Sequence, residues 1–306
     1  MNYYRQVAKR FSFVATLAVL LTLSTVANAQ TPAAGAPQST PTPSPTPAPS
    51  LEKKFISNIL HDQRAIWTSP FSARRSDIKW LVPLGISTGA LLGTDRNTTA
   101  ELLEGGTHQT RLNVSHDIAR IGSFYTVIGT AAGFYLVGRA KSDQRARETG
   151  VLGAEALIDA NIVTASLKLV TQRPRPIFDN GRGRFRADGN SFPSGHATNA
   201  WALATVIAQE YKHRPLIKWG AYSLAAAVSI SRYTGRNHFL SDALVGSAIG
   251  YGVGRYVYRV HHDKSLDNDD DDAGITSFRK SKFFPMITPE YSRVARAYGA
   301  RLSWSF

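Results

Sequence analysis

Helix-forming apolar segments fill most of the chain from Leu51 to about residue 260, and they constrain its fold more than any other feature. The first, LEKKFISNILHDQRAIWT, places its large apolar side chains near one helical face and its charges opposite. Loops rich in Gly, Pro, Asn or charge separate the later segments. Further helices are expected near residues 77–93, 117–140, 148–172, 195–211, 217–231 and 239–260. No strand-like alternation precedes the C-terminal tail, so the pattern predicts an all-α helical bundle.

The length of the apolar runs bears on whether this bundle lies in a membrane. A spanning helix needs about 20 mostly apolar residues. Only Ile121 to Gly138 comes close, and the other uncharged runs are shorter. The run lengths favour a soluble or peripherally attached protein, with an integral, multi-span protein as the alternative.

The N-terminus has the pattern of an export signal. A basic stretch precedes the apolar run FSFVATLAVLLTLSTV, and ANA before Gln30 fits cleavage after small residues. We interpret residues 1–29 as a signal peptide, with an uncleaved anchor as the alternative, and residues 30–50 as a proline-rich linker. The chain has no cysteine, so its stability cannot depend on disulfides.

The C-terminus differs in composition from the helical segment at 51–260. Residues 261–274 form an acidic linker, which lacks the spaced ligands, central glycine and terminal glutamate of a calcium-binding loop. In the tail, 275–306, aromatic and aliphatic residues alternate with small or polar ones in YGARLSWSF. This alternation predicts a short β-strand or hairpin.

The net charge indicates the chemistry of the partners. It is +14 for the whole chain, and removal of Arg5, Lys9 and Arg10 with the signal peptide lowers it by three to +11. A basic exported protein attracts phosphorylated metabolites or anionic lipid head groups. Nucleic acid is not expected as a partner, because no nucleic-acid-binding module is recognisable. The oligomeric state cannot be predicted from the sequence.

Three short blocks carry candidate functional residues. In KLVTQRPRP, Lys168 and Arg175 are two cations close to a helix end, and Pro176 follows. Such cations can hold an oxyanion from separate directions, although they also commonly complement a helix dipole.

The second block is PSGH at 193–196. Pro193 and Ser194 suit the start of a helix, and Gly195 lets the backbone approach a ligand closely. The free N–H groups of such a first turn bind anions. His196 is then expected beside the bound anion.

The third block is SRYTGRNHFLSD at 231–242. His238 and Asp242 are four residues apart, so on a helix the carboxylate would accept the imidazole Nδ1–H and leave Nε2 free to attack. A merely stabilising His–Asp pair has the same spacing. Arg232 would supply a third cation.

Together the blocks resemble the signature of the type 2 phosphatidic acid phosphatase and vanadium haloperoxidase superfamily, KxxxxxxRP, PSGH and SRxxxxxHxxxD. All eleven defining positions are present between Lys168 and Asp242 with the right order and internal spacing. The resemblance implies that family's α-helical bundle for residues 51–260. It also implies a phosphoric monoester hydrolase of the acid phosphatase or phosphatidate phosphatase type, which the predicted signal peptide would place in the periplasm.

The resemblance further implies a role for each residue. His238 would attack phosphorus while Asp242 holds it in place. His196 would protonate the leaving group and then activate water. The groups expected to bind the phosphate oxygens are Lys168, Arg175, Ser194, Gly195 and Arg232. No metal or other cofactor is expected.

Two alternatives remain open at this point. One is a vanadate-dependent haloperoxidase, since vanadate in such a pocket can activate peroxide. The other is a non-catalytic envelope binding protein. The sequence also leaves open whether the phosphate is carried by a lipid or a small soluble ester, and whether it is a monophosphate or a pyrophosphate. Arg182, Arg184 and Arg186 form a candidate substrate loop, for which a solvated surface loop is the alternative.

Overall fold

The computed structural model describes residues 51–72, 75–104, 109–267, 286–292 and 297–303. The predicted signal peptide and proline-rich linker lie outside these residues, as does the acidic run after Asp267. They remain predictions from the sequence.

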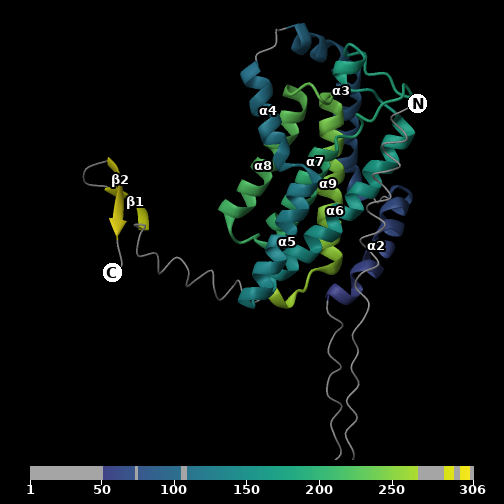
Figure 1. Ribbon diagram of the computed structural model, residues 1–306. Coiled ribbons are helices and arrows are strands. Elements are labelled where there is room, and N and C mark those ends of the chain that lie inside the picture. Colours follow the sequence, from purple (N-terminus) through teal and green to yellow (C-terminus); the bar gives the residue numbers. More distant parts are fainter. Residues whose placement is uncertain (1–50, 73–74, 105–108, 268–285, 293–296, 304–306) are drawn as a thin grey trace, which may run out of the picture. The chain divides into compact units, whose positions relative to one another are not determined.

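The main body is a bundle of α-helices, which confirms the predicted fold class (Figure 1). Short 3₁₀ turns join some of the helices. The α-helices are α2 (Leu51–Thr68), α3 (Ile78–Glu104), α4 (Gln109–Ile121), α5 (Phe124–Lys141), α6 (Gln144–Thr171), α7 (Gly195–Glu210), α8 (Pro215–Thr234) and α9 (Leu240–His261). The 3₁₀ turns are η2 (Ser69–Ser72), η3 (Arg75–Asp77) and η4 (Pro176–Phe178).

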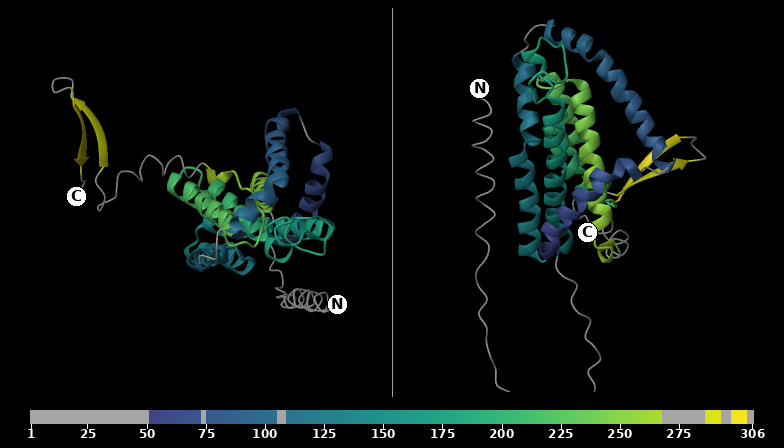
Figure 2. Two further views of the ribbon diagram at one scale, coloured as in Figure 1. Left: turned by 90° about the horizontal axis from the view of Figure 1, so that it is seen from above. Right: turned by 90° about the vertical axis from the view of Figure 1, so that its right-hand side faces the viewer.

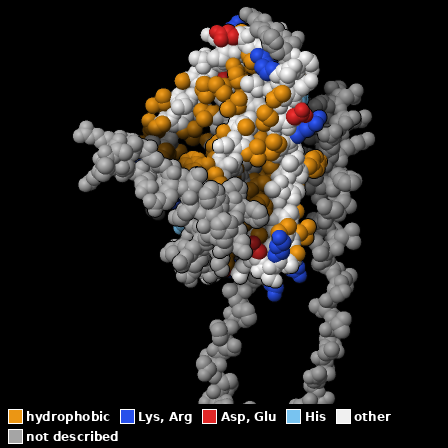
Figure 3. Space-filling view, turned by 90° about the vertical axis from the view of Figure 1, so that its left-hand side faces the viewer, with side chains coloured by type: hydrophobic (Ala, Val, Ile, Leu, Met, Phe, Trp, Pro, Cys, Tyr) orange, Lys and Arg blue, Asp and Glu red, His pale blue; other side chains and the backbone are white. Residues whose placement is uncertain are grey.

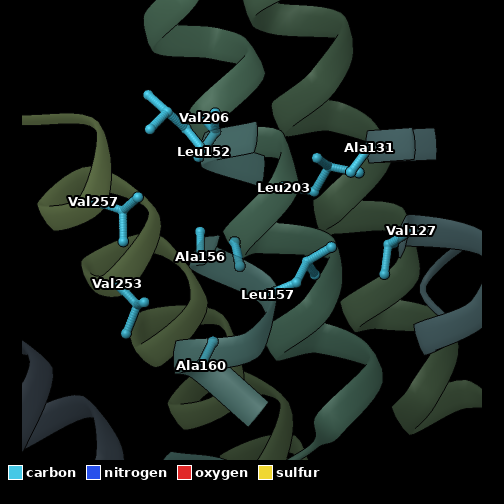
Figure 4. Packing of buried hydrophobic residues seen from close by; sticks show 11 residues of the cluster. Val127, Ala131, Leu152, Ala156, Leu157, Ala160, Leu203, Val206, Val253 and Val257 are labelled. Atoms are coloured by element: carbon cyan, nitrogen blue, oxygen red, sulfur yellow. The ribbon is translucent and has the colours of Figure 1, made fainter. Parts of the chain in front are cut away.

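The core lies where α5, α6, α7 and α9 pack together (Figure 4). Its side chains are small or medium-sized aliphatics, so the helices approach one another closely. The residues of this cluster are Val127, Ala131, Leu152, Ala156, Leu157, Ala160, Ala202, Leu203, Val206, Val253 and Val257. Burial of such aliphatic surface is the main favourable contribution to the stability of the bundle.

Helices α7 and α9 make the most extensive contact, and glycines allow it. Gly246, Gly250 and Gly254 recur every four residues on one side of α9. A Cβ on Gly250 would lie 2.2 Å from the carbonyl oxygen of Thr198, and one on Gly246 would lie 2.5 Å from that of Ser194. This close packing brings the first turns of α7 and α9 together.

Two predicted helix boundaries were wrong. The helix expected over 117–140 is divided into α4 and α5, whose axes differ by 41°. Ser123 starts α5 as its N-cap, and its hydroxyl accepts a hydrogen bond from the N–H of Thr126. The helix expected over 77–93 continues to Glu104, because Asp95 and Thr99 are buried against the bundle rather than solvated.

The helix that comes closest to a membrane span is also not the expected one. By length and composition the continuous segment Gln144–Phe178 could cross a membrane, and α4 with α5 could do so as one bent span. Within the apolar window of Gln144–Phe178, however, 61% is buried inside the protein. The core helix of a soluble protein passes the same test.

At the C-terminus, β1 (Met286–Ser292) and β2 (Ala297–Ser303) form an antiparallel hairpin. Met286 pairs with Ser303, and Ser292 pairs with Ala297. The second strand overlaps the alternating stretch YGARLSWSF, which begins at Tyr298.

Candidate active site

The ends of α6 and α8 and the starts of α7 and α9 meet at one end of the bundle. The N–H of Ser194, the N-cap of α7, donates to the carbonyl of Asp242 over 3.0 Å. The Nζ of Lys168, in the last turn of α6, donates to the carbonyl of Asn190 over 2.5 Å. Gly122 also lies against this end, since a Cβ there would be 2.8 Å from the carbonyl oxygen of His196. The three sequence blocks therefore lie together.

His238 is buried and precedes α9 rather than lying on it. Its Nδ1 lies 2.8 Å from the carbonyl oxygen of Ser191. Because a carbonyl oxygen only accepts hydrogen bonds, Nδ1 carries the proton and Nε2 keeps its lone pair. Burial lowers the pKa of His238 to about 4, although the nearby Asp242 opposes this shift. The imidazole is therefore neutral at physiological pH.

Asp242 holds His238 differently from the arrangement expected on a helix. Its Oδ2 lies 3.6 Å from the imidazole Nδ1, too far for a good hydrogen bond. Instead, Oδ2 accepts from the hydroxyl of Ser191 at 2.5 Å and from the N–H of Phe239 at 3.0 Å. Asp242 thus acts on His238 through Ser191 and through the first turn of α9. Burial opposes its ionisation, but the nearby His238 and the charge of Arg173 hold its pKa below the usual value.

Arg173 was not predicted from the sequence, although it is the most buried cation of this region, at 2% exposed. It donates to Oδ1 of Asp242 over 2.7 Å and to Oδ2 of Asp95, on α3, over 2.9 Å. Its guanidinium also lies 3.9 Å from the ring centre of Phe239. Ser241 joins the same network, because its hydroxyl bonds to both Arg173 and Asp95. Arg173 therefore fixes the carboxylate that supports His238.

The predicted phosphate-binding cations Lys168, Arg175 and Arg232 have no ion pair with any carboxylate in the described part of the chain. Burial, together with the charge of Arg175, lowers the pKa of Lys168 to about 8 and that of Arg232 to about 10. Among the described residues, Arg232 Nε and Ser194 Oγ are buried without a hydrogen-bond partner. Uncompensated cations and unused donors at a helix start are the features of an anion site.

His196 lies in the first turn of α7, within electrostatic reach of His238 and of the three cations. Burial, and then the charge of Arg232, lowers its pKa to about 3. A bound anion would oppose this effect, because it would neutralise the cations that disfavour the imidazolium.

The candidate substrate loop lies outside this cluster. The side chains of Arg182, Arg184 and Arg186 are exposed, and the first two border a shallow hollow of about 440 Å³. Gly183, in the left-handed conformation with φ of 65°, presents its carbonyl to Arg173 Nε at 3.0 Å. The loop is therefore anchored to the buried network while its arginines face solvent.

The comparisons with known proteins agree with these blocks. Residues 150–266 match the family model described as PAP2 superfamily. This segment belongs to that superfamily. It contains most of α6, all of α7 to α9 and all eleven signature positions, whereas α2 to α5 lie outside the match.

Two curated relatives come from Porphyromonas gingivalis. A lipid A 1-phosphatase is 42% identical over 80 residues, 25% of this chain and 18% of that protein. A lipid A 4'-phosphatase is 34% identical over 77 residues, 25% of this chain and 32% of that protein. The aligned segment thus spans a third or less of each relative.

Two solved structures align with this chain at 22% identity. LpxE of Aquifex aeolicus aligns over 52% of this chain and 92% of that chain, with a TM-score of 0.43. The first transmembrane PAP2 type phosphatidylglycerolphosphate phosphatase from Bacillus subtilis aligns over 61% and 96%, with a TM-score of 0.46.

Proposed function

We propose that this chain is a phosphatase that hydrolyses lipid-borne phosphate monoesters or pyrophosphates through a phosphohistidine on His238. The observation that carries the proposal is the meeting of His238, with a free Nε2, and three cations that lack a carboxylate partner among the described residues. A phosphate group would compensate those cations and use the unpaired donors of Ser194 and Arg232.

In the first step, His238 Nε2 forms a bond to phosphorus while the bond from phosphorus to the leaving oxygen breaks. His196, protonated once the phosphate is bound, gives its proton to the departing alkoxide. Lys168, Arg175 and Arg232 stabilise the charge that develops on the equatorial oxygens. The Nδ1–H of His238 remains bonded to the Ser191 carbonyl, which favours the cationic phosphohistidine.

In the second step, water attacks phosphorus and the bond to His238 Nε2 breaks. His196, now neutral, takes the proton from that water as its oxygen bonds to phosphorus. Inorganic phosphate leaves and both histidines return to their starting states. The three cations supply the electrostatic stabilisation, so we propose that the reaction needs no metal ion.

We further propose that the enzyme acts at the surface of a membrane after export. The names of the two P. gingivalis relatives specify lipid A as their substrate. The region of the candidate site carries exposed apolar side chains next to its cations, including Leu169 at 74%, Val170 at 67% and Phe178 at 76% exposed. Apolar side chains beside cations suit the interface of an anionic membrane.

The rest of the bundle is also apolar on the outside. The first half of α3 diverges from the other helices, and its three glycines have open space around them (Figure 2). Its exposed large side chains are Ile78, Trp80, Leu81, Val82 and Ile86. Hydrophobic side chains also gather, with few charges between them, on the side where α4 and α8 lie (Figure 3). Such extensive exposed apolar surface is uncommon on a protein that stays in water.

The first experiment measures p-nitrophenyl phosphate hydrolysis by the purified protein in EDTA. We expect turnover that orthovanadate inhibits and that His238→Ala abolishes. The matched control is His116→Ala, which removes an exposed histidine on α4. Activity that survives His238→Ala, or that depends on added metal, would contradict the mechanism.

The lipid part of the proposal needs a second experiment. The same protein is given a lipid phosphate in anionic vesicles and a water-soluble ester of the same type. We expect a higher kcat/KM for the lipid and cosedimentation with the vesicles. Equal rates without cosedimentation would leave the phosphatase proposal intact and reject the membrane substrate.

A third experiment tests the arginine loop. Replacing Arg182 and Arg184 with Glu should raise KM for a pyrophosphate more than for a monophosphate, because the second phosphate would lie nearer the loop. An equal rise for both substrates would argue against this contact.

A further inference from the structure

A second polar cluster lies at the other end of the same helices. Glu148 is in the first turns of α6, Glu210 ends α7, and His262 follows α9. Glu148 and Lys168 are 20 residues apart on α6, which corresponds to about 30 Å along the helix. This cluster is therefore remote from the candidate active site.

We propose that Glu148, Glu210 and His262 bind a divalent transition-metal ion such as Zn²⁺, which ties together the ends of α6, α7 and α9. One ligand atom from each residue lies within 4.8 Å of the other two. His262 Nδ1 is 2.8 Å from Glu148 Oε1 and 3.5 Å from Glu210 Oε1. Ligands about 2.05 Å from a tetrahedral zinc ion lie about 3.3 Å apart, so only small side-chain movements are required.

Unsatisfied carboxylate oxygens give independent support. Glu148 and Glu210 are 1% and 0% exposed. Among the described residues, Glu148 Oε2 and both carboxylate oxygens of Glu210 have no hydrogen-bond partner, although the Arg145 guanidinium lies 4.0 Å from Glu210 Oε2. Buried anionic oxygens without hydrogen bonds are costly, and a coordinated cation removes that cost for the oxygens it binds.

The groups around His262 orient it as a ligand. Its Nε2 lies 3.2 Å from Asp267 Oδ1, which Lys212 holds through a 2.7 Å contact. In the structure His262 Nδ1–H donates to Glu148 Oε1 at 2.8 Å. A metal ion would displace this proton, and with Nε2–H donating to Asp267 the Nδ1 lone pair would then face the two glutamates. A carboxylate on the second nitrogen is the usual support of a metal-binding histidine. The ring of Tyr258 stacks on the imidazole with 4.3 Å between the ring centres.

The donor set narrows the choice of ion. One imidazole and two carboxylates suit zinc, iron or manganese, while calcium and magnesium prefer oxygen ligands alone. The two carboxylates also neutralise the charge of a divalent ion. A solvent molecule would complete a four-coordinate site.

The test uses the full chain without a histidine tag, stripped with chelator and titrated with Zn²⁺. We expect one ion per chain by calorimetry and elemental analysis. With free Zn²⁺ at about 100 times its Kd, Tm should rise by about 5 to 10 °C. Glu210→Gln should lose both the stoichiometric binding and the rise in Tm. Glu155→Gln, which alters a buried glutamate of α6 outside the cluster, should keep both.

A measurement on the unaltered chain keeps the test valid if Glu210→Gln does not fold. Co²⁺ in a four-coordinate site with nitrogen and oxygen ligands gives strong visible absorption, which Zn²⁺ should abolish by displacement. No stoichiometric Zn²⁺ binding to the unaltered chain, or binding that Glu210→Gln leaves unchanged, would overturn the proposal. Turnover at a temperature well below Tm should not change on metal removal, so this test is separate from that of the phosphatase mechanism.

Discussion

Arg173 offers the sharpest test of how the bundle supports its candidate active site. Replacing it with Gln would leave Asp95 and Asp242 buried without their shared cation. Removing one partner of a buried ion pair costs about 3 to 5 kcal/mol. Two carboxylates lose their partner here, and contact with the Phe239 ring is also lost, so we expect the upper end of that range. The cost is a large part of the 5 to 15 kcal/mol that stabilises a typical domain.

The assay combines thermal unfolding with turnover of p-nitrophenyl phosphate. A loss of about 5 kcal/mol corresponds to a Tm lower by about 10 to 20 °C for a domain of this size. Below that Tm we expect kcat to fall by about 10- to 100-fold, because Asp242 no longer fixes the position of Ser191 and His238. KM should change little, since the side chain of Arg173 bonds to Asp95, Asp242, Ser241 and Gly183 and to none of the groups proposed to bind phosphate.

A double-mutant cycle distinguishes this network from general damage to the core. Asp95→Asn removes one of the two stranded carboxylates, so it should restore part of the stability lost in Arg173→Gln. We expect a coupling of about 1 to 3 kcal/mol. A melting temperature for Arg173→Gln within 2 °C of the unaltered protein, or strictly additive effects in the cycle, would refute the reasoning.

Three other predictions concern packing, pH and the leaving-group acid. Gly250→Ala should destabilise the fold by about 1 to 3 kcal/mol, because its Cβ would meet the α7 backbone. Gly252→Ala, whose Cβ would lie in open space, should stabilise the fold by up to about 1 kcal/mol. Equal urea midpoints for the two variants would contradict the packing argument. Burial raises the pKa of Glu155 and of Asp159 to about 7, so the folded state keeps protons that the unfolded state releases. The free energy of unfolding should therefore fall between about pH 4 and pH 7, by an amount on the order of 3 kcal/mol for each carboxyl, and change little at higher pH. Replacing Glu155 with Gln and Asp159 with Asn should flatten the pH dependence of the urea midpoint. Phosphate binding should raise the pKa of His196 from about 3, which NMR titration with and without phosphate would detect; an unchanged value would exclude it as the proton donor.

The helical fold could be predicted because its signals are local. Apolar periodicity locates most of the helices, and Gly, Pro and polar loops separate them. The division between α4 and α5 was missed because Gly122 and Ser123 are uncharged and interrupt no hydrophobic run. Their effect depends on α7 and α8, since a Cβ at Gly122 would clash with the backbone of His196 and the side chain of Val228.

The candidate site could be predicted only as far as its residues form a spaced pattern. The eleven signature positions do, and the structure brings the predicted histidines and cations together. Asp95 does not belong to such a pattern, because it is 78 residues from Arg173 and lies in a stretch that resembles a polar loop. Arg173 was visible in the doubled RPRP, but only the second arginine fits the family spacing. Ser191 was missed because its carbonyl is a group that any residue has, and its hydroxyl meets Asp242, 51 residues away, only in the folded chain.

The direction of the helices explains why one bundle would carry an anion site at one end and a cation site at the other. Helices α7 and α9 both begin beside His238, so their positive ends add to the cations there. The same helices end at Glu210 and His262, where their negative ends favour a cation. Among the described residues, cations without a carboxylate partner therefore collect where α7 and α9 start, and buried carboxylate oxygens without hydrogen bonds collect where they end. A cation at the helix starts or an anion at the helix ends would be opposed by the helix dipoles. We therefore assign phosphate to the end of the bundle where α7 and α9 start, and the metal ion to the end where they finish.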